Sequence, residues 1–351
     1  MSQILVSVII PSMNEEKTIG SCIQKALLAF KNEGIDGEIL VSDNSTDMSR
    51  EIAMSLGAKV VIPRNKGYGN AYFEGVRYAK GDHFLLTDAD DTYDLGEAPK
   101  LLEPLLTNKA DLVIGTRLKG DIKPGYSHCG MRAITRKAYE KLNLKSEGME
   151  YASEMIIEAA RKKLRIAEVP ISYYPRLTPS KLHSWGDGWR HLRFMMLYNP
   201  TPFLFIPGFL VFLLGVFMTS ALAIRGNVET TGLHSLVLGS MLAVIGTQMI
   251  ATDSYMKVYG IMHNKIDKTG ITALLLDYHS LETGLLLGVI LLIGGIVSGS
   301  GVIFKWISSG YGSLSEVGNA VIAMVLAAIG IQIIFSTLII SIFLLDTKDS
   351  K

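Results

Sequence analysis

Hydrophobic and polar positions alternate in short runs over the first half of the chain. Up to about Arg193, charged residues are scattered throughout, and brief apolar runs are separated by segments that repeat apolar residues at helical spacing, such as Thr18–Phe30. The runs occur at Leu5–Ile10, Glu38–Ser42, Lys59–Ile62, His83–Thr87 and Asp111–Gly115. Strands that alternate with helices predict βαβ units, and therefore an α/β fold whose mainly parallel sheet is covered on both faces.

The second half has a different pattern, in which charged residues nearly vanish. Four uncharged stretches are each long enough to cross a bilayer, which takes about 20 apolar residues; they are Phe203–Ile224, Leu233–Thr252, Thr283–Phe304 and Val317–Leu345. Buried helices of a large soluble core are the alternative, but the length and the lack of charge favour lipid. We therefore expect an all-α bundle of four transmembrane helices.

The basic residues indicate how these helices are oriented. The loop between the second and third stretches carries Lys257, Lys265 and Lys268, whereas the two loops opposite offer Arg225 and Lys305. Basic residues collect on the cytoplasmic side of membrane proteins, and the first strand is not preceded by a secretory signal pattern. We expect an integral protein of the cell membrane, with its first half and both chain ends in the cytoplasm.

Net charge and cysteine content narrow the functional classes. The formal net charge is +1 and the chain has no stripe dense in Lys and Arg, which argues against a nucleic-acid binder. The two cysteines, Cys22 and Cys129, form neither a disulfide framework nor a metal-ligand spacing. Cys22 falls in an amphipathic helical pattern and is interpreted as a core thiol.

Polar residues follow the ends of the predicted strands. In open parallel sheets, ligands bind at the carboxyl ends of the strands, where the loops converge. One such end is explained by helix capping, for example by Ser45, but five together predict a nucleotide site. The candidates at these ends are Pro11, Asn14, Glu15, Asp43, Ser45, Lys66, Gly67, Asp88, Ala89 and Asp90.

Asp88 and Asp90 flank a small residue at a strand end. Two carboxylates this close repel each other unless a cation lies between them, and a divalent ion with hard oxygen ligands fits. Such an ion would bridge a diphosphate and neutralise charge on a leaving nucleoside diphosphate. An acidic turn that caps the next helix is the alternative, and the spacing alone does not decide between the two.

The other candidates have similarly open interpretations. Lys66 and Gly67 bring a cation and open backbone N–H groups to a helix start, which suits a phosphate, but they match neither the Walker pattern nor GxGxxG and also fit an ordinary turn. Asp43 suits a base or a ribose, or a local Asx-turn. Glu150 and Glu154 share a helical face; Glu154 would hold a sugar hydroxyl or an arginine, or be solvated. Cations near the site are Arg117, Arg132, Arg176 and Lys181.

Taken together, the motifs resemble glycosyltransferase family 2, and within it the polyprenyl-phosphate group that includes dolichol-phosphate mannose synthase and the dolichol- and undecaprenyl-phosphate glucose synthases. The resemblance runs from about Val6 to Leu182. It is carried by Val8-Ile9-Ile10-Pro11, Asn14-Glu15, Asp43, Lys66-Gly67, Asp88-Ala89-Asp90, Gly115-Thr116-Arg117, Cys129-Gly130-Met131-Arg132-Ala133 and Ser180-Lys181-Leu182. It implies a Rossmann-like GT-A domain with a mainly parallel sheet.

The resemblance also implies roles for individual residues. The nucleotide sugar would contact Pro11, Asn14, Glu15, Asp43 and Asp88, and Asp90 would bind Mg²⁺ or Mn²⁺. Arg117 and Lys181 would contact phosphates, and we group Arg117 and Arg132 with Asp90 as catalytic candidates. The implied reaction is inverting transfer of a hexose from a UDP- or GDP-sugar to a polyprenyl (dolichyl or undecaprenyl) phosphate. The run Asp88–Tyr93 favours a UDP-glucose type donor, and homo-oligomer formation stays open.

One segment departs from the family pattern. Relatives carry a longer, partly amphipathic segment between the positions of Arg117 and Cys129, where this chain has only Leu118–His128, and they place an aspartate where this chain has Tyr126. A catalytically inactive membrane scaffold that retains the fold is therefore one alternative. A processive polysaccharide synthase is another, although the QxxRW motif expected of that class does not occur.

These features predict three parts along the chain. Residues 1–181 form the GT-A domain, residues 182–201 an interfacial amphipathic helix and linker, and residues 202–351 the transmembrane domain. Trp185, Trp189, Leu192 and Met196 fall on one helical face with basic residues on the others, which indicates a helix at the membrane surface. A plain domain-packing helix is the alternative.

Overall fold

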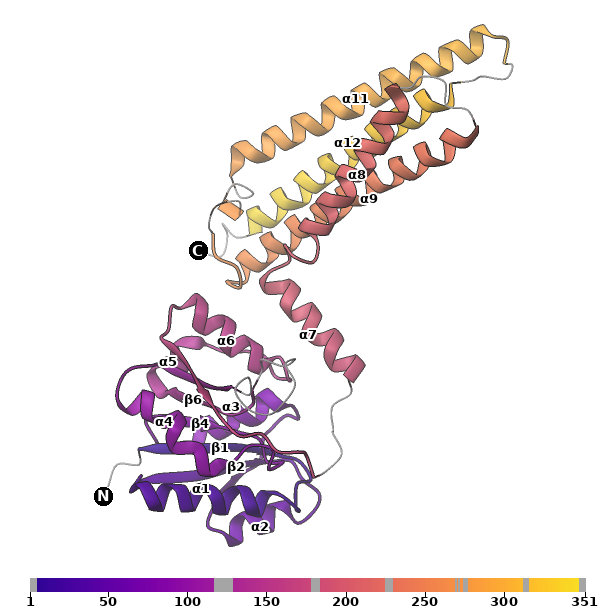
Figure 1. The fold of residues 1–351 in the computed structure, drawn as a ribbon. Helices are drawn as coiled ribbons and strands as arrows, with labels where there is room; N and C mark the ends of the chain where they lie inside the picture. The colour runs from indigo at the N-terminus through magenta and orange to yellow at the C-terminus, as the bar shows by residue number, and fades with distance from the viewer. Residues whose placement is uncertain are drawn as a thin grey trace. The chain divides into compact units, whose positions relative to one another are not determined.

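The computed structural model describes residues 5–116, 129–177, 184–224, 230–268, 270, 272–273, 277–311 and 316–346. It forms two compact units, Met1–His191 and Leu192–Lys351 (Figure 1). Arg117 and Lys181, the short segment with Tyr126, and Arg225 in the first loop of the membrane half lie outside the described residues.

The first unit is built on one seven-stranded sheet with the order β3-β2-β1-β4-β6-β5-β7. Parallel pairs join β1 to β2 and β4, β2 to β3, and β5 to β7, whereas β6 runs antiparallel to β4 and β5. The mainly parallel α/β sheet predicted from the alternating pattern is therefore confirmed. The strands are β1 (Val6–Ser12), β2 (Gly37–Asp43), β3 (Lys59–Val61), β4 (His83–Leu86), β5 (Leu112–Thr116), β6 (Arg132–Thr135) and β7 (Ile166–Pro170).

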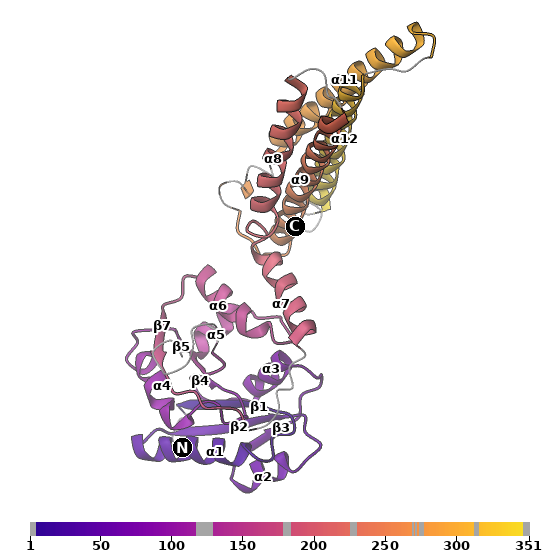
Figure 2. The same ribbon diagram turned by 45° about the vertical axis from the view of Figure 1, so that its right-hand side comes forward.

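Helices cover both faces of this sheet. Figures 1 and 2 show α1 and α2 on one face and α3, α5 and α6 on the other. The two-sided cover explains why the central strands bury apolar side chains on both faces: Ile9, Ile10, Leu40 and Leu85 have no exposed surface. The helices are α1 (Ile19–Glu33), α2 (Ser49–Ser55), α3 (Tyr68–Tyr78), the 3₁₀ turn η1 (Leu95–Glu97), α4 (Ala98–Leu106), α5 (Arg136–Leu142) and α6 (Tyr151–Arg161).

Cys22 lies in the core of this unit, as predicted. Its side chain has no exposed surface on α1, and burial raises the pKa of the thiol to about 12. A neutral thiol of this kind packs as a small apolar group.

The second half contains four helices that are long and apolar enough to cross a membrane. They are α8 (Phe205–Ile224), α9 (Thr230–Met262), α11 (Tyr278–Ser308) and α12 (Val317–Asp346), and they follow α7 (Ser184–Tyr198), which straddles the two units. The side chains of Trp185 and Trp189 on α7 are 89% and 54% exposed. The predicted four-helix membrane half is confirmed.

Helix α9 continues ten residues beyond the uncharged stretch expected from the sequence. Lys257 therefore lies in the helix, and not in a loop. Its ammonium is 2.7 Å from a carboxylate oxygen of Asp253, one helical turn earlier. Because the two charges satisfy each other on one helix face, the helix does not need to end where they begin.

The membrane helices pack through small residues. α8 lies against α9, α9 against α12, and α12 against α11. A Cβ atom on Gly215 of α8 would lie 2.2 Å from the backbone nitrogen of Ala243 on α9, and one on Gly295 of α11 would lie 2.6 Å from that of Ala327 on α12. Such close approach of backbones is the usual basis of helix association in lipid.

Candidate active site

A pocket of about 410 Å³ opens at the carboxyl ends of the central strands. Seven of the residues expected at a nucleotide site line it, namely Pro11, Glu15, Lys66, Gly67, Asp88, Ala89 and Asp90. Tyr68, Gly148, Met149 and Arg176 also line it. Of these four, only Arg176 was noted from the sequence as a nearby cation. Tyr68 directly follows Gly67 at the start of α3, and that adjacency is the signal that would have found it.

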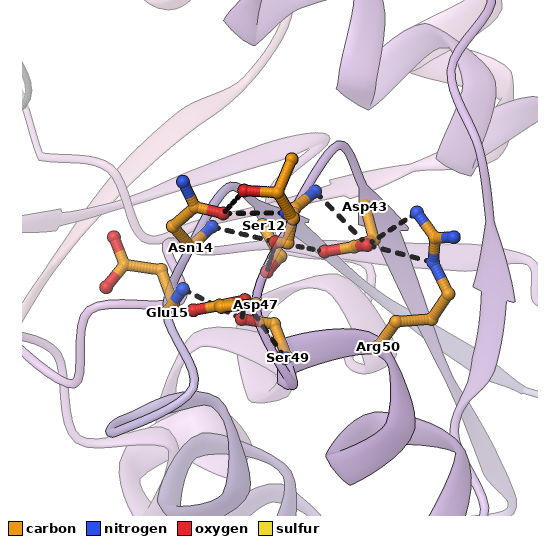
Figure 3. Close-up of polar contacts among 9 residues, drawn as sticks. Ser12, Asn14, Glu15, Asp43, Asp47, Ser49 and Arg50 are labelled. Atoms are coloured by element: carbon orange, nitrogen blue, oxygen red, sulfur yellow. Dashed lines mark hydrogen bonds and ion pairs between the residues drawn. The ribbon is translucent and has the colours of Figure 1, made fainter.

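The loops that follow β1 and β2 are fastened to each other at one side of the pocket (Figure 3). Asn14 has a φ of 56° and its amide oxygen accepts a hydrogen bond from the backbone N–H of Thr46 at 2.8 Å. The backbone N–H of Asn14 in turn donates to the Ser45 hydroxyl at 2.7 Å. The backbone N–H of the next residue, Glu15, donates to the Ser49 hydroxyl at 2.8 Å. Asn14 and Ser45 therefore shape the pocket edge because their side chains hold the backbone of the two loops together.

Asp43 is completely buried beneath this edge (Figure 3). Its carboxylate accepts a hydrogen bond from the Ser45 hydroxyl at 2.5 Å and lies 3.1 Å from both Nε and Nη2 of Arg50. The backbone N–H of Ser45 also reaches the carboxylate at 3.3 Å, which is the Asx-turn geometry. The neighbouring Asn44, and not Asp43, is among the residues that line the pocket.

Asp88 lines the pocket and is held by Tyr68. The Tyr68 phenol donates a hydrogen bond to the Asp88 carboxylate at 2.7 Å. Gly130 closes the other side, because a Cβ atom there would lie 2.3 Å from the second carboxylate oxygen. Burial, followed by the repulsion of nearby Asp90, raises the pKa of Asp88. A carboxylate in this position gains from a cation beside it.

Asp90 is 3% exposed and both of its oxygens are engaged. One accepts hydrogen bonds from the hydroxyl of Thr92 at 2.6 Å and from the backbone N–H of Thr92 at 3.1 Å. The other forms an ion pair with Nη2 of Arg176. The segment after β7 delivers this arginine, because a bridge pairs Tyr93 with Tyr173.

The next residue, Asp91, anchors the acidic turn to α1. It has a φ of 58°, a left-handed conformation that is uncommon for residues other than glycine. Its carboxylate accepts hydrogen bonds from Ser21 and from Lys25, both at 2.9 Å. These contacts hold the backbone of the turn in place, so that Asp88 and Asp90 keep their positions at the pocket.

The carboxylate pair suits a divalent cation. Asp88 and Asp90 provide hard oxygen ligands, and their mutual repulsion is relieved when a cation binds. Among the described residues, no group of three or more His, Cys, Asp or Glu side chains is placed to hold a metal ion. The remaining ligands would therefore come from a bound diphosphate and from water, as is usual for Mg²⁺.

Arg132 lies behind the pocket. It is 2% exposed, and its guanidinium donates to the carbonyl of Cys129 at 2.8 Å and to that of Ala152 at 3.3 Å. Its positive charge lowers the pKa of Asp88, against the larger effect of burial. Arg132 therefore acts on the site through the electrostatic field and the backbone around it.

Glu154 is not on a solvated face, which was one of the alternatives left open by the sequence. It has no exposed surface, and one carboxylate oxygen accepts backbone hydrogen bonds from Lys145 at 2.9 Å and from Ser146 at 2.7 Å. This fixes the loop that leads to Gly148 and Met149 in the pocket wall. The loop fits closely against the start of α3, because a Cβ atom on Gly69 would lie 2.0 Å from the carbonyl oxygen of Ser146.

The chain matches two family models. Residues 7–157 match glycosyl transferase family 2, and residues 254–344 match the glycosyltransferase family 2 C-terminal transmembrane region. Among solved structures, the glucosyl-3-phosphoglycerate synthase of Mycobacterium tuberculosis in complex with Mn²⁺ and UDP-glucose is 23% identical, with a TM-score of 0.46 over 55% of this chain and 78% of that one.

Two curated relatives come from Haloferax volcanii. The low-salt glycan biosynthesis hexosyltransferase Agl6 is 35% identical in an alignment 366 positions long, gaps included, that covers 95% of this chain and 88% of the relative. A dolichyl-phosphate hexose transferase is 31% identical over 208 residues, 52% of this chain and 89% of the relative. With the match to Agl6 extending across both halves, the chain belongs to glycosyltransferase family 2 and is a glycosyltransferase with a membrane-spanning C-terminal half.

Proposed function

We propose that this glycosyltransferase moves a hexose from a nucleotide sugar to a polyprenyl phosphate at the cytoplasmic face of the membrane, with Mg²⁺ or Mn²⁺ as cofactor. The observation that carries the proposal is the placement of Asp88 and Asp90 together in one pocket with the cations Lys66 and Arg176. The names of the two relatives support a hexose as the transferred group and a dolichyl phosphate as the acceptor class.

The donor would bind through its diphosphate. Asp88 and Asp90 would hold the divalent cation, which neutralises negative charge on the leaving nucleoside diphosphate. Lys66 places a positive charge at the pocket, and the backbone N–H groups at the start of α3 favour an anion there. Pro11, Glu15 and Met149 complete the wall against which the nucleoside packs. A UDP-glucose type donor is favoured by the sequence of the acidic turn.

The acceptor needs little help from a base. The second pKa of a phosphate monoester is about 6, so the attacking oxygen is already ionised at neutral pH. The protein then accelerates transfer mainly by positioning the two anionic substrates and by stabilising the leaving group. Arg117 and Lys181 stay in the proposal as phosphate contacts, and attack on the face opposite the leaving group gives inversion.

The test is a transfer assay on membranes that contain the protein. Labelled UDP- and GDP-hexoses are offered with short polyprenyl phosphates in the presence of Mg²⁺ or Mn²⁺, and a labelled lipid-linked monosaccharide is the expected product. Asp90→Ala should abolish transfer. Asp111→Ala is the matched control, because it removes another aspartate whose ion pair, with Arg165, lies outside the pocket lining.

Each other outcome contradicts part of the proposal. Equal transfer by Asp90→Ala and wild type would show that Asp90 does not hold a metal ion that transfer needs. Label that accumulates in a growing polymer would identify a processive synthase. The absence of transfer from every donor would favour an inactive scaffold.

The cytoplasmic orientation rests on the basic loop after α9. Lys265 and Lys268 lie in this loop, and basic residues favour the cytoplasmic side. In intact cells, Lys268→Cys should not be labelled by an impermeant maleimide, because the loop would lie in the cytoplasm. Both native cysteines are buried and should add little background labelling. Labelling from outside would reverse the topology.

A further inference from the structure

Arg176 lies on the carboxylate that the proposed cofactor needs. Nη2 of Arg176 pairs with one oxygen of Asp90, and the other oxygen is held by Thr92. Asp90 therefore has no oxygen free of a positive or hydrogen-bonding partner. A guanidinium and a divalent cation on one carboxylate oxygen repel each other, so the two arrangements compete.

The backbone brings Arg176 to this position by specific contacts. The backbone N–H of Tyr174 donates to the carbonyl of Thr92 at 2.8 Å, and Tyr93 bridges to Tyr173. The stretch before Arg176 thus runs alongside the acidic turn and presents the arginine to it. The ion pair spans 86 positions of the sequence, and these backbone contacts account for its formation.

Arg176 is held by fewer contacts than Arg50 and Arg132. Arg50 is bound through two nitrogens to Asp43, and Arg132 is buried with two backbone carbonyl partners. Arg176, by contrast, has a side chain that is 34% exposed in the pocket lining and is held by one ion pair, to Asp90. Among the described residues, leaving the carboxylate costs the Arg176 side chain this one ion pair.

We propose that Arg176 is an exchangeable counter-ion of the donor site: it neutralises Asp90 before the donor binds, and moves to the diphosphate when Asp90 takes up the divalent cation. This deepens the proposed function and rests on its metal and diphosphate. The exchange keeps Asp90 paired at every stage, because a buried carboxylate without a partner is costly. It also couples the binding of the nucleotide to that of the cation. The diphosphate gives Arg176 a new partner, and the cation replaces Arg176 on Asp90.

Metal binding tests the exchange without an acceptor lipid. Purified full-length protein in detergent is titrated with Mn²⁺ alone and with Mn²⁺ plus UDP or GDP, and free Mn²⁺ is followed by electron paramagnetic resonance. In wild type, the better nucleotide should tighten Mn²⁺ binding strongly. In Arg176→Ala, Mn²⁺ alone should bind more tightly than in wild type, the nucleotide more weakly, and the coupling between them should fall about tenfold.

Two further variants keep the result interpretable. Arg165→Ala removes another arginine paired with an aspartate, Asp111, and should leave all Mn²⁺ and nucleotide affinities unchanged. Arg176→Lys retains the charge without the planar fork, and should give a coupling between those of wild type and Arg176→Ala.

Three results would overturn the exchange. If Arg176→Ala binds Mn²⁺ alone no more tightly than wild type, the arginine does not compete for Asp90. If the nucleotide affinity is unchanged, the arginine does not move to the diphosphate. If wild type binds no Mn²⁺ with either nucleotide, there is no exchange, whereas hexose transfer in the membrane assay is decided separately.

Discussion

The Tyr68 phenol donates a hydrogen bond to the Asp88 carboxylate, with the two oxygens 2.7 Å apart. Tyr68 begins α3, and Asp88 follows β4, so the contact joins two sides of the pocket. The hydrogen bond opposes the increase in the pKa of Asp88 that burial causes. Tyr68 is therefore a positioning residue that favours the ionised, metal-binding form of Asp88.

Removal of this phenol should weaken metal binding. Tyr68→Phe is expected to lower Mn²⁺ affinity about tenfold, because a hydrogen bond to a charged group contributes roughly 1.5–3 kcal/mol. The loss should grow as the pH is lowered. Mn²⁺ titration over a pH series measures both effects. Tyr139→Phe, which removes the partner of the Tyr151 hydroxyl elsewhere in the core, should leave Mn²⁺ affinity unchanged; equal losses in the two variants would contradict the positioning role.

Asp88 should make the stability of the protein depend on pH. Its pKa is raised in the folded state by burial, so the folded protein holds the proton more tightly than the unfolded chain does. Stability should consequently fall as the pH rises from the ordinary value of a carboxyl group to the raised one. Without metal, Asp88→Asn should melt at a higher temperature than wild type at neutral pH, and the difference should vanish in acid. Identical melting curves at both ends of the range would contradict the raised pKa.

The ion pair between Asp43 and Arg50 should stabilise the folded protein. Arg50→Met leaves the fully buried Asp43 without its counter-charge and should cost about 3 kcal/mol of unfolding free energy. The double variant Asp43→Asn/Arg50→Met should recover most of that loss, because a neutral amide still accepts the Ser45 hydrogen bond. Denaturant unfolding measures this. A double variant as unstable as Arg50→Met would show that the charge is not the cause.

Glu154 should affect the donor without touching it. Glu154→Ala removes the acceptor of two backbone N–H groups and is expected to lower the free energy of unfolding by about 3 kcal/mol. The freed loop carries Met149 in the pocket wall, so the KM for the donor should rise more than kcat falls. Glu154→Gln keeps an oxygen acceptor and should lie close to wild type. Steady-state kinetics that show a loss in kcat alone would argue for a direct catalytic role.

Adjacent glycines of α11 give a matched test of the membrane packing. A Cβ atom on Gly295 would lie 2.6 Å from the backbone of Ala327 on α12, whereas one on Gly294 has no heavy atom within 4 Å. Gly295→Ala should therefore destabilise the protein by about 1–3 kcal/mol. Gly294→Ala should be neutral or slightly stabilising because alanine favours helix. Thermal unfolding in detergent compares them, and equal effects would contradict the close packing.

The fold was largely predictable from the pattern of apolar residues. Strands buried on two faces and helices in lipid both require uninterrupted apolar runs, so β1, β4 and the four long helices were expected near their observed positions. The end of α9 was not, because Lys257 is neutralised by Asp253 one turn earlier and the helix continues. Charge marks the end of a span only where it has no partner.

The residues of the candidate site were largely predictable, but the contacts between them were not. Asp88, Asp90 and Lys66 were identifiable because loops after parallel strands meet at one edge of the sheet. The burial of Glu154 could not be predicted, because the carboxylate accepts backbone hydrogen bonds from Lys145 and Ser146, in a loop that folds back over α6. Arg176 was one of several cations with nothing to distinguish it.

The order of residues along the chain settled which segments avoid water and which polar groups end the strands, since solvent preference is a property of each residue and its near neighbours. The folded protein settled which charges meet: Asp90 with Arg176, Asp88 with Tyr68 and Asp43 with Arg50. Such pairings depend on distances of a few ångströms between loops. Those distances come from the twist and order of the sheet and from backbone contacts such as Tyr93 with Tyr173, which leave no local mark in the sequence.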